Sequence, residues 1–490
     1  TEFFNNVINI LVEGPIMQND FYSYHSKQLS FDYNDDNLNI ESTYQDALIK
    51  SLTDDLDFHN HSSSYATHNF HSFPAKFPPQ LPSKFILSLT NEGDIVLDPM
   101  MGSGTTVLEA FLTGRKAIGF DIDPLAVLGA RVKTTRLKAM ELTENYRSIL
   151  YNARNQVKHE RDHLNKELAD RWDLKTKEFV DYWFALETQM ELIALLLQIT
   201  KIQNEKVRFF FELALSATII TKSGGVSLAL DLAHTRPHKA KIVIDQDGTV
   251  ICGKELDENS SPRLSILTKK LRSAIDEFEK RCLKNIASLV NSAPGAIEPE
   301  IKFGNAQNLP LGDEVVDLVV TSPPYASNAI DYMRAHKFSL VWLGHPIDDL
   351  SFKRKEYIGG EDTMNTEFEE LPKVPAKIVA DMTRIDPKRG KVLHRYYSEM
   401  KRTLQEMFRV LKPNKAAIVV VGNSMMRGKD TQIPYCLAEI GKTIGFEVPK
   451  IGTRKLDRNK RMLPAAATLD NNSQIQQRMH AEYVIGFYKS

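Results

Sequence analysis

The stretch that decides the fold reads Asp94-Ile95-Val96-Leu97-Asp98-Pro99-Met100-Met101-Gly102-Ser103-Gly104-Thr105-Thr106. Its first five residues form an apolar run with the length of a buried strand, and the residues that follow, Val107–Leu112, have the character of a helix. The glycines between them carry no Cβ that would block a ligand, and the start of a helix offers free backbone N–H groups. The segment therefore predicts a strand, a ligand-binding turn and a helix.

The same alternation continues on both sides of this stretch. A short amphipathic helix is predicted at Pro82–Leu89, after the Pro-punctuated aromatic loop Phe73–Phe77. A second strand is predicted at Lys116–Asp121, and Pro124 favours the first position of a second helix. Strand, helix, strand and helix at this spacing open a parallel α/β sheet.

The α/β pattern is interrupted and then resumes. Residues 135–298 are mostly helical in pattern and contain one predicted hairpin with its turn at Asp245–Gly248. Beyond them we expect strands at Ile301–Gly304, Val315–Val320 and Ala417–Val421, a long polar segment at about 345–390, and a helix that ends at Leu411. Phe446–Val448 and Tyr483–Tyr488 are predicted to form an antiparallel pair that closes the sheet. Four parts follow: a polar N-terminal extension (1–70), a first α/β part (71–134), a helical insert (135–298) and a second α/β part (299–490).

Bulk composition limits the class of protein. The chain has 490 residues, 42% apolar and 26% charged, which is typical of a soluble globular protein of two or three domains. The net charge of -1 neither supports nor excludes a nucleic-acid partner, because positive charge can be gathered on one face. The 3 cysteines form no close pair, which is typical of a reducing, cytoplasmic location. We expect no membrane span, since no stretch of about 20 apolar residues occurs.

A histidine-rich stretch precedes the α/β part of the chain. It contains His59, His61, His68 and His71, with Asp57 nearby. Because these spacings match no standard zinc site, we interpret the stretch as a polar surface segment and expect no bound metal.

Two polar residues accompany the glycine turn. Asp121 ends the second predicted strand, where a carboxylate can accept both hydroxyls of a ribose; the alternative, a helix cap, suits Asp123 better. Asn305, after the third core strand, can bond an adenine amino group or serve only as a turn residue. The turn lacks the Gly-Lys-Ser/Thr of a phosphate-binding loop, and it lacks the third glycine of a dinucleotide-binding fold. The turn therefore favours a different nucleoside-containing ligand.

The most specific motif is Thr321-Ser322-Pro323-Pro324-Tyr325, which directly follows a buried strand. Two consecutive prolines fix the backbone and remove two donors, which leaves carbonyl and hydroxyl acceptors beside an aromatic ring. Such acceptors suit a neutral amino group, and Tyr325 can stack on a base held outside its duplex. The alternative is a strand-ending turn without chemistry. The motif therefore favours transfer to an exocyclic amino group, with Ser322, Pro323, Pro324 and Tyr325 as catalytic residues.

Here the sequence resembles the amino-methylating DNA methyltransferases, and most closely the cytosine-N4 enzymes of restriction-modification systems. The resemblance covers roughly residues 70–134 and 300–490. It implies a Rossmann-like, seven-stranded methyltransferase sheet with the helical insert added, S-adenosyl-L-methionine as cofactor, double-stranded DNA as substrate and a cognate restriction endonuclease as partner. For the cofactor it implies Phe73, Lys76, Phe77, Asp98, Pro99, Met100, Gly102, Gly104, Thr105, Asp121, Ile122, Asn305 and Ala306. The family's Gly-Asp-Ala motif reads Gly304-Asn305-Ala306 here, so the adenine contact departs from the pattern.

The identity of the methylated base depends on Ser322. In the family, Ser-Pro-Pro-Tyr is typical of cytosine-N4 enzymes, whereas adenine-N6 enzymes usually carry Asp or Asn at the first position. Methylation of carbon 5 of cytosine needs a thiolate, normally in Pro-Cys, and this chain has no Pro-Cys. The prediction is site-specific cytosine-N4 methylation by direct transfer to a flipped base. An adenine-N6 enzyme, an RNA amino methyltransferase and a catalytically silent specificity subunit remain alternatives.

Basic residues near the catalytic motif and the last strands are candidates for holding DNA phosphates. We expect this role for Arg354, Arg454, Arg458 and Arg461, against the alternative of solvated loops. Tyr332, Arg334, His336 and Lys337 are expected to line the pocket for the flipped base, so Arg334 and Lys337 also count as DNA-binding residues. The insert is the candidate target-recognition domain, although a structural or partner-binding role is also open.

Overall fold

The computed structural model describes residues 43–59, 61–73, 78–221, 223–230, 232, 237–253, 268–290, 297–326, 331–364, 366–456 and 481–490. The architecture below is that of the compact unit Tyr44–Ser490. Within the described ranges, every helix is too short or too polar to cross a bilayer.

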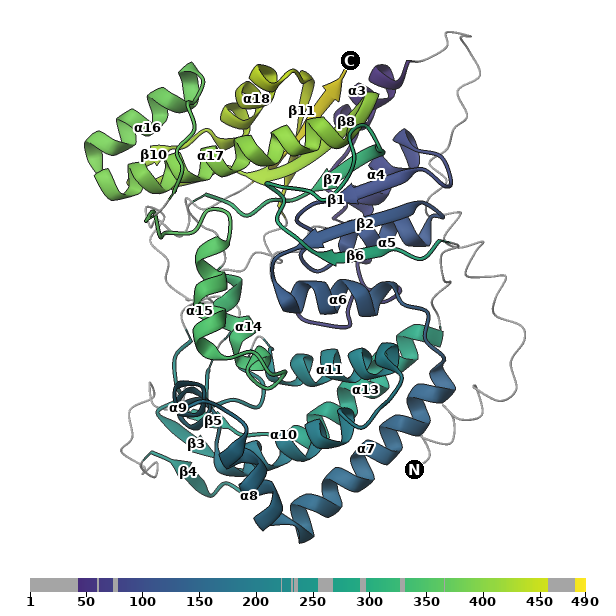
Figure 1. Ribbon diagram of the computed structural model, residues 1–490, viewed down its shortest axis with the longest axis vertical. Helices are drawn as coiled ribbons and strands as arrows, with labels where there is room; N and C mark the ends of the chain where they lie inside the picture. Colours follow the sequence, from purple (N-terminus) through teal and green to yellow (C-terminus); the bar gives the residue numbers. More distant parts are fainter. Residues whose placement is uncertain are drawn as a thin grey trace. The chain divides into compact units, whose positions relative to one another are not determined.

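A seven-stranded sheet forms the centre of this unit (Figure 1), in the order β11-β12-β8-β7-β1-β2-β6. Only β12 runs against its neighbours, pairing antiparallel with both β8 and β11. The Rossmann-like seven-stranded sheet and its antiparallel closing pair are therefore confirmed. The strands are β1 (Ile95–Asp98), β2 (Lys116–Asp121), β6 (Glu300–Phe303), β7 (Val316–Thr321), β8 (Leu411–Gly422), β11 (Glu447–Lys455) and β12 (Ala481–Lys489).

Helices cover both faces of the sheet, so its central strands are apolar throughout. Successive side chains of a strand point to opposite faces. Leu97 and Val319 therefore belong to one core with α17, whereas Val96 and Leu318 belong to another with α4. The helices that flank the sheet are α3 (Tyr44–Thr53), α4 (Gln80–Leu89), α5 (Thr105–Leu112), α6 (Pro124–Thr134), α17 (Pro387–Val410) and α18 (Ile433–Ile444).

The segment before Phe73 differs from the expected polar extension. Leu48 and Leu52 of α3, together with Leu56, are almost fully buried in the second sheet core. Their four-residue spacing places three apolar side chains on one side of an otherwise polar stretch. Residues 44–70 are thus integrated into the α/β unit.

Two histidines of the same segment are buried and not on the surface. His68 Nε2 lies 2.8 Å from Glu109 Oε1 on α5, and His71 Nε2 lies 2.9 Å from Ser216 Oγ on α11. Both rings are at most 3% exposed. Polar groups at these depths require hydrogen-bond partners, so the two histidines join the segment to the domain instead of lying on a polar surface.

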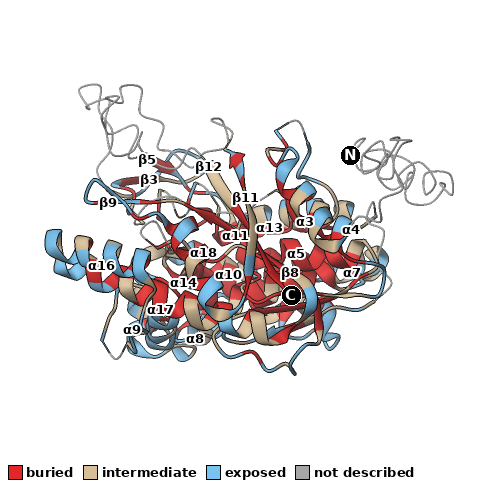
Figure 2. Cartoon of the chain, turned by 90° about the horizontal axis from the view of Figure 1, so that it is seen from above, coloured by how far each residue is buried: buried red, intermediate tan, exposed pale blue. Residues whose placement is uncertain are grey.

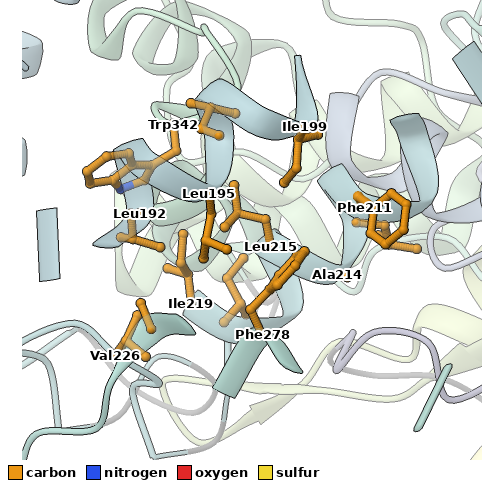
Figure 3. Packing of buried hydrophobic residues seen from close by; sticks show 14 of the residues in the cluster. Leu192, Leu195, Ile199, Phe211, Ala214, Leu215, Ile219, Val226, Phe278 and Trp342 are labelled. Atoms are coloured by element: carbon orange, nitrogen blue, oxygen red, sulfur yellow. The ribbon is translucent and has the colours of Figure 1, made fainter. Parts of the chain in front are cut away.

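The insert packs on the α/β part as a helical layer. It comprises α7 (Ala139–His159), α8 (Arg161–Asp170), α9 (Leu174–Trp183), α10 (Leu186–Ile199), α11 (Glu205–Ile219) and α13 (Ala274–Val290). The predicted hairpin is confirmed as β3 (Ile242–Ile244) and β4 (Val250–Cys252), and β5 (Thr268–Lys270) pairs parallel to β3. Figure 3 shows Leu195, Leu215 and Phe278 in one cluster with Trp342, which follows α14. The insert and the segment after the catalytic motif therefore share a hydrophobic core.

The long polar segment expected near 345–390 contains two helices. These are α15 (Ile347–Glu356) and α16 (Lys373–Ile385), and they follow α14 (Tyr332–Leu340). Each buries very little, which explains the polar sequence: α15 buries only Leu350, and α16 only Pro375 and Met382. Figure 2 shows the largely exposed surface of α16. A short hairpin, β9 (Met425–Met426) and β10 (Lys429–Asp430), completes the described elements.

Candidate active site

The glycine turn joins β1 to α5 at the carboxyl end of the sheet. Gly102 and Gly104 have φ values of +47° and +78°, a region that L-residues rarely adopt. A Cβ on Gly104 would lie 2.7 Å from the Cβ of Ala130 on α6, so this position must lack a side chain for α5 and α6 to pack. The sequence of the turn is thus set by backbone conformation and by close helix packing together.

Asp121, at the end of β2, is bonded to this turn. Its Oδ2 accepts the N–H of Gly102 at 2.8 Å, and its Oδ1 accepts the N–H of Asp123 at 2.9 Å. The cap of α6 is Asp123, whose Oδ1 accepts the N–H of Leu125 at 2.8 Å. The preference for Asp123 as the cap is therefore confirmed.

A pocket opens at the carboxyl ends of β1, β2, β6 and β7, where ligands of such sheets bind. About 870 Å³ of space between its walls holds no protein atoms, and part of that space is open to solvent. Its lining consists of Phe73, Asp98, Pro99, Met100, Met101, Gly102, Ser103, Thr105, Asp121, Ile122, Asp123, Gly304, Asn305, Ala306, Ser322, Pro324, Tyr332, Tyr357 and Ile358.

Most of the predicted cofactor residues meet in this pocket, although they come from four separate stretches of sequence. Gly104 lies behind it, as the cap of α5. Lys76 and Phe77 are outside the described residues. Asn305 serves as a turn residue, because its Oδ1 accepts the N–H of Gln307 at 3.0 Å, and it also lines the pocket. Its bond to an adenine amino group stays a prediction.

Two buried carboxylates give the pocket its electrostatic character. Burial raises the pKa of Asp98 to about 6 and that of Asp121 to about 7, the latter with a further contribution from the charge of Asp123. A ligand that carries positive charge and hydroxyl donors would favour the ionised forms of both. S-adenosylmethionine carries a sulfonium, an ammonium and two ribose hydroxyls, so these residues fit it.

The catalytic motif reaches the same pocket from β7. Ser322 and Pro324 are among its lining residues, whereas Pro323 is buried beneath. Tyr325 lies beside the pocket and not in its lining, and its hydroxyl donates to Glu482 Oε1 at 2.9 Å. The cofactor turn and the catalytic motif, far apart in sequence, thus border one cavity.

The pocket wall includes residues that carried no clear signal in the sequence. Tyr357 and Ile358 follow α15, well beyond the catalytic motif, and only the fold brings them to the cavity. Asp123 accepts from the Tyr357 hydroxyl at 2.8 Å, and its Oδ2 lies 2.6 Å from His336 Nδ1. Burial alone would raise the pKa of Asp123, but the charge and hydrogen bonds of these partners hold it below its usual value.

The predicted base-pocket residues Tyr332 and His336 separate in the structure. Tyr332 lines the cavity and stacks on Phe73, with ring centroids 5.5 Å apart. His336 is fully buried behind it, against Asp123. His336 therefore supports the wall of the cavity from behind.

Three predicted DNA-binding cations gather on α14 and α15. Arg334 Nε and Arg354 Nη2 lie 2.8 Å and 2.5 Å from the same oxygen of Asp331, at the start of α14. Lys337 is close enough to both for burial and their charges to lower its pKa. Two guanidiniums thus share one carboxylate, with the Lys337 ammonium nearby, so positive charge gathers beside the catalytic motif.

The cations predicted on the last strands behave differently. Arg454 is only 8% exposed and pairs with Glu482, so it does not offer a free guanidinium to a phosphate as expected. Its side chain lies inside the sheet edge, where the sequence suggested a solvent-facing basic loop. Arg458 and Arg461 lie outside the described residues.

Comparison with known proteins agrees with these motifs. The family model described as DNA methylase, N6_N4_Mtase, matches residues 16–130. The Type II methyltransferase M.MvaI of Kocuria varians is 26% identical over 85% of this chain and 90% of its own length. The Type II methyltransferase M.BsoBI of Geobacillus stearothermophilus is 22% identical over 80% of this chain and 81% of its own length.

A solved structure of a SAM-dependent methyltransferase from Methanosarcina mazei covers 83% of this chain and 96% of its own, at 13% identity. Its TM-score of 0.27 is too low for that structure to add to the description of the site. The glycine turn, the acidic residue after β2 and the Ser-Pro-Pro-Tyr motif, together with these matches, indicate that the chain is an S-adenosylmethionine-dependent DNA methyltransferase, similar to the amino-methylating N4/N6 enzymes.

Proposed function

We propose that this enzyme methylates the N4 amino group of cytosine at specific sites in double-stranded DNA, as the modification enzyme of a restriction-modification system in the cytoplasm. The observation that carries the proposal is the position of Ser322. Ser322 follows the end of β7 and lines the same cavity as Asp98 and Asp121. A target amino group bound there would lie next to the cofactor.

The chemistry assigned to the protein is mainly positioning. S-adenosylmethionine supplies a methyl group activated by the sulfonium. The Asp121 carboxylate would accept the ribose hydroxyls, and Asp98 would neutralise the ammonium of the methionine part. The Ser322 hydroxyl and the carbonyls beside Pro323 and Pro324 would accept the N–H groups of the target, which directs the nitrogen lone pair toward the methyl group. Tyr325 would stack on the flipped base.

Direct transfer is favoured over a covalent enzyme–base intermediate. Such an intermediate needs a reactive thiolate, and the three cysteines of the chain are not among the pocket-lining residues. Burial raises the pKa of Cys282 well above its usual value and that of Cys436 to about 11, which disfavours both thiolates.

We further propose that α14, α15 and the insert hold the DNA. The cations of α14 and α15 lie directly after the catalytic motif in the chain, and the insert shares its core with α14. A duplex bound by the insert would therefore be held in a fixed position relative to Ser322. Hydrogen exchange with cognate and noncognate duplexes tests this role: we expect protection of the insert that depends on sequence, and sequence-independent protection there would contradict it.

Identification of the methylated nucleoside tests the proposed function. Purified protein is incubated with DNA and methyl-labelled cofactor, and the DNA is digested to nucleosides. We expect labelled N4-methylcytosine, with Ser322→Ala as the inactive control. Labelled N6-methyladenine alone would assign the enzyme to the adenine class. Sequencing of host DNA with detection of modified bases, with and without this protein, would then give the recognition site.

A further inference from the structure

Beneath the catalytic tyrosine lies a buried ion pair that the motif does not include. The Tyr325 hydroxyl donates to one carboxylate oxygen of Glu482, at 2.9 Å, and the other oxygen accepts from Arg454 Nη1. Arg454 and Glu482 face each other across the antiparallel pair of β11 and β12. One residue after β7, one on β11 and one on β12 thus form a hydrogen-bonded chain.

This chain is largely shielded from solvent. The Arg454 and Glu482 side chains are 10% and 13% exposed. A carboxylate at this depth is costly unless both of its oxygens are satisfied, and here the guanidinium satisfies one and the phenol the other. Removal of Glu482 would leave the Arg454 charge and the tyrosine hydroxyl without this partner.

The contact fixes both the direction of the hydrogen bond and the orientation of the ring. A carboxylate only accepts, so the Tyr325 hydroxyl must donate to it and stays protonated. Burial and the Glu482 charge raise the pKa of Tyr325 well above its usual value. Pro323 and Pro324 restrain the backbone before the ring, and Glu482 restrains its far end. The ring is therefore oriented before any DNA arrives.

We propose that Glu482, held by Arg454, is a positioning residue that orients Tyr325 as the platform for the target base. The inference rests on the proposed function, because it assumes that Tyr325 stacks on a flipped base. Preorganisation of this kind accelerates transfer by removing motion that would otherwise have to be frozen in the reacting complex. It also gives the last strand of the sheet a role in catalysis, although the strand adds no residue to the pocket lining.

Coupling between the two side chains is the quantity to measure. Tyr325→Phe keeps the ring and removes the donor, Glu482→Ala removes the acceptor, and the double variant combines them. We expect each single variant to lower the single-turnover rate of methyl transfer roughly tenfold, and the double variant to be no slower than either one. Cofactor affinity should stay within about twofold of the wild type, because both side chains are outside the cofactor turn.

A matched control and a spectroscopic readout separate positioning from folding. Glu447→Ala removes an exposed glutamate at the start of the same β11–β12 hairpin and should leave the transfer rate unchanged. Fluorescence of 2-aminopurine at the target position should report slower or less complete flipping in Glu482→Ala. If Glu482→Ala does not fold, Glu482→Gln, which keeps the shape and the acceptor, provides the same comparison with a smaller expected effect.

The outcomes bear separately on the two proposals. The positioning role would be overturned if the rate reductions of Tyr325→Phe and Glu482→Ala multiplied in the double variant. It would also be overturned if a Glu482 variant transferred methyl groups as fast as the wild type. The measured coupling does not depend on which base is methylated, because the assay measures transfer of the labelled methyl group to cytosine and to adenine alike. Failure of the proposed function would appear in the nucleoside digest instead.

Discussion

The carboxylate of Asp121 accepts the backbone N–H of Gly102 at 2.8 Å, which joins the end of β2 to the cofactor turn after β1. Asp121 also lines the pocket, so one residue both shapes the turn and borders the space for a ligand. This double role makes its removal informative.

Asp121→Ala should weaken binding of S-adenosylmethionine by roughly 10- to 100-fold, the scale of losing hydrogen bonds to a charged group. Titration calorimetry measures the dissociation constant directly. Asp121→Asn, which keeps an acceptor for the Gly102 N–H, should lose less. Equal affinity in wild type and Asp121→Ala would refute the ribose assignment.

Cofactor affinity should depend on pH in a defined direction. Asp98 and Asp121 have pKa values raised to about 6 and about 7, and only their ionised forms accept hydroxyl or ammonium donors. Affinity should therefore be full above pH 8 and fall as the pH drops through 7 and then 6, by up to about tenfold per unit for each protonated group.

The Asp121→Asn variant serves as the control for this titration. Groups on the ligand titrate identically with both proteins, so the difference between the two curves isolates Asp121. Parallel curves would show that the pH dependence arises elsewhere.

Gly104→Ala should destabilise the protein through a backbone effect and a clash. The φ of +78° costs about 1 kcal/mol for a residue with a Cβ. The approach to Ala130 adds roughly 1–3 kcal/mol of overpacking. Gly93→Ala is the matched control, since Gly93 has a φ of +87° and a Cβ there would meet no heavy atom within 4 Å. Urea unfolding should place Gly104→Ala clearly below Gly93→Ala; similar stabilities would mean that α5 and α6 move apart at little cost.

Ser322→Ala and Tyr325→Ala should reduce methyl transfer more than cofactor binding. Loss of a positioned polar group or of the stacking ring is expected to lower the transfer rate by roughly a hundredfold. Single-turnover assays at saturating cofactor measure the rate, and calorimetry measures the affinity. A variant that loses affinity and rate in equal proportion would place the side chain in the cofactor site instead.

The cations of α14 and α15 should contribute to DNA affinity through phosphates. Replacement of Arg334 and Arg354 by alanine should weaken binding to all sequences alike and lower the salt dependence of log Kd by about one unit for each phosphate that is no longer neutralised. Arg384→Ala is the matched control, because Arg384 on α16 pairs with Asp381 at the same three-residue spacing as Arg334 with Asp331. An unchanged salt dependence in the Arg334 and Arg354 variants would remove this surface from the DNA interface.

The sequence by itself determined the strands and first helices of the sheet and the two motifs. The apolar run before Asp98, the glycines after it and the proline at position 124 act through local backbone chemistry, so strands, turn and helix starts could be predicted from them. The cap of α6 was also assigned correctly to Asp123, because a capping residue must directly precede its helix.

Only the tertiary structure decided which distant residues meet. Burial of α3 and of His68, the approach of Tyr357 to the pocket, and the pairing of Arg454 with Glu482 beneath Tyr325 all depend on contacts between segments far apart in the chain. A basic residue in a strand looks the same in sequence whether it faces a phosphate or a buried carboxylate. The partner that the fold places opposite it, and the loss of water around the pair, decide between the two.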